Sequence, residues 1–260
     1  MDRRQALLTR PRGRNPANPF GYAAPMMHRT PRLGFVASAL AAALLPVTAA
    51  AQPQGTRLFN GENLSGWSHF LVDATVQAAD VWSVKDGVLV CRGEPLGYLY
   101  TNAEYTSFKL IVEWRWAPGA AARLGKTPNS GVLMRVDREP KPKGVPRAYE
   151  AQLQAGSAGD LYGFWGLPLD GDAARRREAK GHELLGDMVG FRKIEAAEKA
   201  EGEWNTYEIT LDGPSLVVLV NGKRVNEAKG AAVVPGRIAL QSEGGEIHFR
   251  RVEIWPIPSR

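Results

Sequence analysis

Apolar and polar residues alternate with a period of two along most of the chain from Arg57 onward. The clearest run, residues 108–116, alternates over nine residues, as expected for a strand with one buried face. Two such runs are interrupted by Asp86–Gly87 and by Asn221–Gly222, pairs that accept the positive φ of a hairpin turn. The pattern therefore predicts two hairpins in a protein made mainly of antiparallel strands.

Further strands are predicted where similar runs lie between turn residues, at 132–136, 149–153, 204–211, 237–242 and 247–254. In the last of these, Arg250 and Arg251 break the alternation, which predicts a β-bulge. Helical periodicity is weak except in residues 173–200, where one or two short helices are expected on a long loop. Many short strands with regular turns indicate an all-β jelly-roll sandwich of two antiparallel sheets with long loops and little helix.

Charge is distributed unevenly along the chain. Residues 1–51 hold seven arginines and one acidic residue, which accounts for the formal net charge of +6. The remaining residues balance, with 33 − 7 = 26 basic against 27 − 1 = 26 acidic side chains. A balanced surface argues against binding to nucleic acid.

The first residues also have the organisation of an export signal. Arg29 and Arg32 precede an apolar run at 33–45, followed by Pro46 and a stretch of alanines. We expect cleavage near Ala51, leaving residues 52–260 as one periplasmic or secreted domain without a stable membrane anchor. An uncleaved anchor is the alternative, but the run is alanine-rich and barely long enough to span a bilayer. With Cys91 as the single cysteine, the fold depends on its core rather than on an intrachain disulfide.

Alternation also places polar side chains on one face of three predicted strands. Glu113, Arg135, Glu150 and Gln152 all occupy the positions that alternate with apolar residues. We therefore expect them to share one outward surface, where carboxylate, guanidinium and amide groups suit sugar hydroxyls and carbonyls. The alternative is an ordinary solvated face on which Arg135 pairs with Glu113 or Glu150.

Seven segments, taken in order, resemble the 3-keto-disaccharide hydrolase family: LFNGENLSGW (58–67), WSVKDGVL (82–89), NSGVLMR (129–135), YEAQL (149–153), EGEWN (201–205), VNG (220–222) and GRIALQSEG (236–244). The resemblance covers about residues 56–257 and implies a concanavalin-like jelly roll in an exported bacterial enzyme. The implied substrates are glycosides already oxidised to a ketone at C3. The chain has no Glu-x-Asp-x-x-Glu strand of the endoglucanase type, which argues against retaining hydrolysis by that carboxylate pair.

The C3 ketone of the substrate that this resemblance implies suggests a reaction in which the polar residues take part. A carbonyl at C3 acidifies the proton at C2, and the enolate formed by its removal expels the C1 substituent by β-elimination, after which water adds to the enone. Such a reaction needs a base and a hydrogen-bonding or positive group at the oxyanion. We assign the base to Glu150 first and Glu113 second, and the oxyanion contact to Arg135.

Other residues near these strands are candidates for substrate binding. Amides that would orient hydroxyls are Asn129, Gln152, Asn205 and Gln241, and the rings that would stack on a sugar are Tyr162 and Trp165. His248 is a candidate proton carrier on an outward position. Glu243 stands where many relatives have histidine in a Leu-Gln-x-His-Gly segment, so a histidine role does not carry over to this chain.

Metal binding stays open at the level of sequence. The histidines of the predicted mature chain, His69, His182 and His248, lack ligand-like spacing, which argues against zinc. Calcium or another divalent ion bound by scattered oxygen ligands would leave no sequence signature. Any nicotinamide cofactor would belong to a separate oxidoreductase that makes the ketone. The alternatives to an enzyme are a non-catalytic carbohydrate-binding jelly-roll module and an envelope protein that docks a partner through residues 173–200. The sequence leaves the oligomeric state undetermined.

Overall fold

The computed structural model describes residues 54–138 and 144–257. The chain divides into two units, 1–49 and 50–260, and the fold described below belongs to the second. The expected export signal and its cleavage near Ala51 lie outside the described residues, so export stays a prediction. Within 54–138 and 144–257, no helix is both long and apolar enough to cross a membrane.

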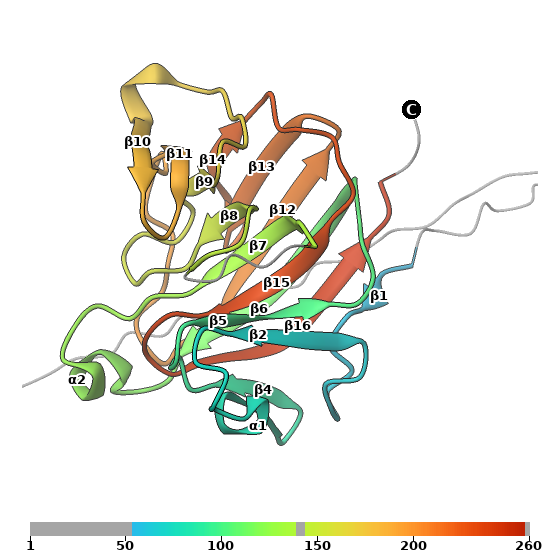
Figure 1. Ribbon diagram of the computed structural model, residues 1–260, viewed down its shortest axis with the longest axis vertical. Helices are drawn as coiled ribbons and strands as arrows, with labels where there is room; N and C mark the ends of the chain where they lie inside the picture. Colours follow the sequence, from blue (N-terminus) through green and yellow to red (C-terminus); the bar gives the residue numbers. More distant parts are fainter. Residues whose placement is uncertain (1–53, 139–143, 258–260) are drawn as a thin grey trace, which may run out of the picture. The chain divides into compact units, whose positions relative to one another are not determined.

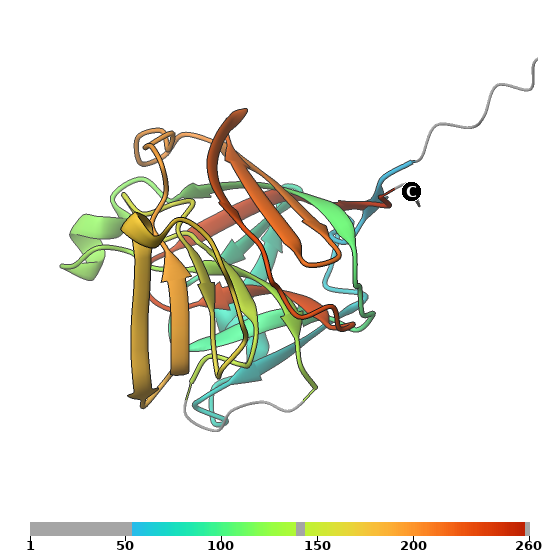
Figure 2. The ribbon, with the colours of Figure 1, turned by 90° about the horizontal axis from the view of Figure 1, so that it is seen from above.

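Two antiparallel sheets of eight strands form two layers, as Figures 1 and 2 show. The first sheet has the order β14-β13-β12-β6-β16-β4-β3, and β1 pairs with β16 at its margin. Its strands are β1 (Thr56–Arg57), β3 (Trp82–Lys85), β4 (Val88–Cys91), β6 (Phe108–Trp116), β12 (Asn205–Asp212), β13 (Ser215–Val220), β14 (Lys223–Ala228) and β16 (Ile247–Trp255).

The second sheet has the order β10-β11-β9-β8-β7-β15-β5-β2. Its strands are β2 (Trp67–Leu71), β5 (Gly97–Thr101), β7 (Gly131–Val136), β8 (Tyr149–Gln152), β9 (Leu161–Gly163), β10 (Arg176–His182), β11 (Gly186–Phe191) and β15 (Arg237–Ser242). The described helices are α1 (Ala78–Val81), α2 (Ala120–Leu124) and a 3₁₀ turn at Ala173–Arg175. These elements confirm the predicted all-β sandwich.

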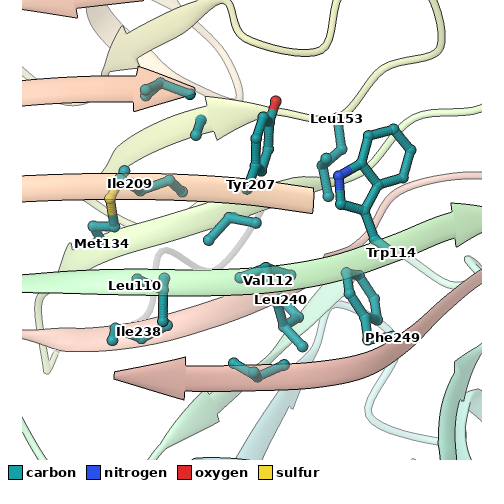
Figure 3. Packing of buried hydrophobic residues seen from close by; sticks show 14 of the residues in the cluster. Leu110, Val112, Trp114, Met134, Leu153, Tyr207, Ile209, Ile238, Leu240 and Phe249 are labelled. Atoms are coloured by element: carbon teal, nitrogen blue, oxygen red, sulfur yellow. The ribbon is translucent and has the colours of Figure 1, made fainter. Parts of the chain in front are cut away.

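The apolar faces of the two sheets meet in the core. The buried face of β6 includes Leu110, Val112 and Trp114, and that of β8 includes Tyr149 and Ala151, as the alternation predicted. Figure 3 shows side chains from both sheets gathered in this core. Each large apolar side chain buried here contributes about 1.5–3 kcal/mol, so the core dominates the stability of a domain whose single cysteine, Cys91, is free.

The predicted turns and the predicted bulge are present. Asp86–Gly87 has φ angles of 51° and 77°, and Asn221–Gly222 has 51° and 79°. Each pair joins the two strands of a hairpin. In β16 the pairing register shifts between Phe249 and Arg251, which confirms the bulge at the two consecutive arginines.

Of the short helices predicted in residues 173–200, the structure has a 3₁₀ turn at Ala173–Arg175, and the prediction is wrong for the residues that follow it. Most of this segment forms the β10–β11 hairpin, yellow and orange in Figure 1, and β11 pairs with β9. The hairpin thereby extends the edge of the second sheet. Sheet hydrogen bonds gained through this tertiary pairing override the weak helical periodicity of the local sequence.

Candidate active site

The structure separates Glu113 from the other residues predicted to share its face. Glu113 lies on β6 in the first sheet, whereas β7 and β8 belong to the second. Its carboxylate lies 2.5 Å from Arg250 Nε and 3.6 Å from Arg251 Nη1. The expectation of one shared surface is therefore wrong for Glu113. Alternation identifies which face of a strand is polar, but it does not identify the sheet to which the strand belongs.

The expected outward direction of Arg135 is also wrong. Val136 pairs with Arg237 and Leu133 pairs with Ala239, so two residues of β7 occupy the interval that one residue occupies on β15. Arg135 takes up this extra position with φ of 50°, in the left-handed region. The bulge inverts the alternation after Met134, and the Arg135 side chain becomes only 2% exposed.

Backbone carbonyls bind the Arg135 guanidinium. Nε and Nη2 donate to Thr106 O at 3.1 and 2.6 Å, and Nη2 also donates to Gly213 O at 2.8 Å. Nη1 donates to Ala232 O. Because these donors already bind three loops, the geometry favours a structural role for Arg135 over an oxyanion contact.

Six of the predicted residues do converge. They line a cavity of about 230 Å³ on the outer face of the second sheet. They are Asn129, Glu150, Gln152, Tyr162, Gln241 and Glu243. Strand register explains their proximity. Glu150 on β8 pairs with Tyr162 on β9. Gln152 lies two residues further along β8, on the same face, and pairs with Gly131 on β7.

Gly131 provides the space in which two polar side chains approach β7. A Cβ atom at this position would lie 1.9 Å from Glu150 Oε1 and 2.7 Å from Gln241 Oε1. Both distances are far below van der Waals contact. The two oxygens therefore lie over the Gly131 backbone, in space that any other residue would fill.

Two carboxyl groups with raised pKa values meet in the cavity. Burial raises the pKa of Glu150 well above its usual 4.5, and the charges of Glu243 and Asp160 raise it further. Burial also raises the pKa of Glu243 to about 7, although a hydrogen bond from Asn129 and the charge of Lys126 oppose the shift. Two acids displaced in this way are typical of a site that moves protons near neutral pH.

Two amide oxygens in the cavity wall have no hydrogen-bond partner among residues 54–138 and 144–257. These are Asn129 Oδ1 and Gln241 Oε1, both buried. Gln152 is fixed in a different way, because its Oε1 accepts from the backbone N–H groups of Leu153 and Gln154 at 2.8 and 2.9 Å. Its amide NH₂ is thereby left to donate. The cavity thus offers acceptors, a donor and two titrating carboxyls to a hydroxyl-rich ligand.

Three predicted substrate-binding residues lie outside the cavity lining. Trp165 packs behind it, and its Nε1 donates to Val145 O at 2.8 Å. Asn205 lies in the first sheet, where its Oδ1 accepts from Lys199 N and from Asn221 Nδ2, both at 2.8 Å. His248 is also in the first sheet, between Arg115 Nε at 3.3 Å and Glu246 Oε1 at 2.7 Å. Asn205 and His248 therefore do not line the candidate cavity, although His248 has the outward position predicted for it, between buried Ile247 and Phe249.

Four apolar residues complete the cavity and were not predicted: Val145, Phe164, Leu185 and Met188. Phe164 could have been predicted from the sequence, since it lies two residues after Tyr162 and side chains two residues apart in a strand point to the same face. Leu185 and Met188 lie in the segment for which the sequence predicted helix. Their place beside the acids depends on the hairpin that this segment forms instead.

A larger depression, about 530 Å³, lies on the outer face of the first sheet. Lys109 and Glu208 line it and form an ion pair at 2.6 Å. We place the candidate site in the smaller cavity because two carboxyls with raised pKa values converge there. Among residues 54–138 and 144–257, no group of three or more His, Cys, Asp or Glu side chains is arranged to hold a metal ion.

Known proteins match this chain at the level of family and fold. A family model described as the 3-keto-alpha-glucoside-1,2-lyase-like domain matches residues 54–255. No curated protein matches the chain. A candidate glycosyl hydrolase from Parabacteroides distasonis has a TM-score of 0.55 at 20% identity, over 78% of this chain and 94% of that one.

Two further solved structures are similar. A second candidate glycosyl hydrolase from Parabacteroides distasonis has a TM-score of 0.52 at 23% identity, over 78% of this chain and 100% of its own. A β-glucanase from Bacillus licheniformis has a TM-score of 0.50 at 12% identity, over 78% of this chain and 98% of its own. At such identities the likeness concerns the fold alone, and it agrees with a jelly-roll sandwich.

Proposed function

This chain belongs to the 3-keto-alpha-glucoside-1,2-lyase-like family, and we propose that it cleaves 3-keto-glycosides by elimination in the cavity that contains Glu150 and Glu243. A carbohydrate-active role follows from the family. The observation that supports the cleavage chemistry is the convergence of two carboxyls with raised pKa values, beside unpaired amide oxygens, over Gly131.

Glu243 suits the role of base. With a pKa of about 7, a substantial fraction of its carboxylate is ionised at neutral pH, and its affinity for a proton is still high. It takes the proton from C2, and the electrons of the C2–H bond form the enolate with the C3 ketone. The Gln152 NH₂ is the donor available to the enolate oxygen. Glu243 is also less buried than Glu150, which is 2% exposed, so its carboxylate form is less disfavoured. This difference favours Glu243 over Glu150, the residue first expected to be the base.

Glu150 suits the role of acid, because its side chain is buried and this burial raises its pKa well above 4.5, which favours the protonated form. As the C1–O bond breaks, the leaving oxygen keeps the bonding electrons and takes the proton of Glu150. The proton on Glu243 exchanges with solvent while the enone is bound. Water then adds to C1 of the enone and gives one proton to Glu150, while Glu243 delivers its exchanged proton to C2. One water is consumed, and both carboxyls recover their starting states.

The test uses 3-keto-glucosides incubated with the purified protein in D₂O. We expect release of the aglycone and one deuterium at C2 of the sugar product. Glu243→Gln lowers kcat by about 10²–10⁴-fold through loss of the base. Glu150→Gln has a similar effect on an alkyl glycoside and a much smaller one on a 4-nitrophenyl glycoside, whose leaving group needs no proton.

Glu113→Gln is the matched control, since it makes the same change on the other sheet and is expected to leave the rate unchanged. Cleavage without deuterium at C2 would contradict elimination. Binding of intact sugars without any cleavage would instead support a carbohydrate-binding module.

A further inference from the structure

The cavity lining combines polar and apolar residues. Its polar side consists of Asn129, Glu150, Gln152, Gln241 and Glu243. Val145, Phe164, Leu185 and Met188 also line the cavity and belong with Tyr162 to one hydrophobic cluster, and we call these four residues the apolar wall. We propose that the apolar wall binds the leaving group of the substrate and selects glycosides with an apolar or aromatic aglycone. This inference rests on the proposed function.

The β10–β11 hairpin brings Leu185 and Met188 to the wall, and its tip is fixed by backbone hydrogen bonds. Trp165 N donates to Leu185 O at 2.9 Å, and Gly166 N donates to Asp187 O at 2.8 Å. The hairpin tip is therefore joined to the chain that follows β9. Its two apolar side chains are held against the sheet rather than left in solvent.

Trp165 holds in place two of the segments that form the wall, the hairpin tip and the segment that contains Val145. Its indole N–H donates to Val145 O at 2.8 Å, so it also fixes the second segment of the wall. Its ring lies against Gly186, where a Cβ atom would come within 2.3 Å of Trp165 Cε3. Trp165 has φ of 55°, a rare conformation for a bulky residue. A strained backbone of this kind persists only where the surrounding contacts hold it. Here the contacts of Trp165 with Val145, Leu185 and Gly186 hold it, and they also fix the positions of the wall residues.

The chemistry of the wall explains the selection. Its four side chains offer no hydrogen-bonding group apart from the weak acceptor sulfur of Met188. A hydroxyl-rich second sugar pressed against them would lose its bonds to water without replacement, whereas an apolar group gains from burial. The polar side already supplies the partners that the keto-sugar ring needs.

The size of the cavity supports the same division. At about 230 Å³ it lies below the roughly 300–1,000 Å³ of sites that enclose a drug-sized ligand. It therefore accommodates the reacting ring and the first part of the aglycone. Selection occurs where that first part meets Leu185 and Met188.

The test compares 3-keto benzyl glucoside with 3-keto methyl glucoside, because the two alcohols are similar leaving groups. A 3-keto glucosyl-glucose disaccharide represents a polar aglycone. We expect kcat/KM for the benzyl substrate to exceed that for the methyl substrate by at least about tenfold, and the disaccharide to be cleaved more slowly than the benzyl substrate.

Met188→Gln changes the wall from apolar to polar at nearly constant size. It is expected to lower the benzyl-to-methyl ratio about tenfold, whereas Met188→Leu keeps the ratio. Trp165→Phe removes the bond to Val145 O and lowers the ratio in part. Ile194→Gln, at a residue 55% exposed, is the control for the same loss of apolar character outside the cavity.

Melting curves establish that each variant is folded. Equal cleavage of all three substrates, or an equal effect of Met188→Gln on all of them, would overturn the inference and leave the proposed function standing. Failure to cleave any 3-keto substrate would overturn the proposed function and this inference with it.

Discussion

At the scale of residues, one extra residue in β7 decides what Arg135 does. Strict alternation would direct its guanidinium to the outer face, where the cavity lies. The bulge opposite Ile238 turns it to the opposite side, and three backbone carbonyls bind it there. No pattern in the sequence marks this bulge, whereas two adjacent arginines mark the one in β16.

Arg135→Met is expected to destabilise the domain by about 3 kcal/mol or more, because buried carbonyls lose a charged donor and each such hydrogen bond contributes about 1.5–3 kcal/mol. Urea unfolding measures the loss. Arg135→Lys keeps the charge and part of the bonding, so it should lose less. If Arg135→Met left the urea midpoint unchanged but abolished cleavage of the 3-keto-glycoside, the result would contradict a structural role and support a catalytic one.

At the scale of elements, local signals identified the strands well. The runs predicted at 108–116 and 237–242 coincide with β6 and β15, and both hairpin turns formed where Asp-Gly and Asn-Gly occur. Alternation also placed Glu150 outward and Tyr149 inward correctly. These features depend on neighbouring residues, which the sequence displays directly.

The candidate site was predicted only in part, because its assembly depends on pairing between distant segments. Alternation does not assign strands to sheets, so Glu113 was grouped with the wrong partners. The β10–β11 hairpin forms by pairing with β9, and the apolar wall appears only once that pairing exists. Five polar residues quoted in the family motifs line the cavity, whereas Arg135 and Asn205 from the same motifs do not. The four apolar residues of the wall lie outside those motifs and were missed.

Gly186→Ala tests how the hairpin tip is built. The added methyl would overlap the Trp165 ring, so we expect a loss of roughly 1–2 kcal/mol from the positive φ and the overlap and a lower benzyl-to-methyl ratio. Thermal unfolding and the two rates measure the effects. Gly181→Ala is the matched control, since Gly181 has φ of 59° with open space around its Cβ position. An equal change in selectivity for both variants would contradict the role of the contact.

At the scale of the whole molecule, the acid pair opposes folding as pH rises. The pKa of Glu243 rises from 4.5 to about 7 on folding, and that of Glu150 also rises. Between pH 4.5 and about pH 7, the folded state therefore holds a proton on Glu243 that the unfolded state has released. The raised pKa of Glu150 acts in the same direction. The free energy of unfolding therefore falls with increasing pH, by at most about 1.4 kcal/mol per pH unit for each carboxyl.

Wild type is accordingly expected to lose stability between pH 5 and pH 7, and Glu243→Gln to lose less because it removes one titrating group. Urea midpoints at several pH values give the two slopes. Glu113→Gln should keep the slope of wild type. Parallel slopes for wild type and Glu243→Gln would show that the Glu243 pKa is not raised on folding.

The three carbonyls that bind Arg135 come from the β5–β6 connection, the β12–β13 turn and the β14–β15 connection. Two of these connections cross from one layer to the other. Fraying at this corner must therefore loosen both layers at once, which makes partial opening costly. Half-open forms with bare strand edges, from which aggregates grow, should accordingly be scarce.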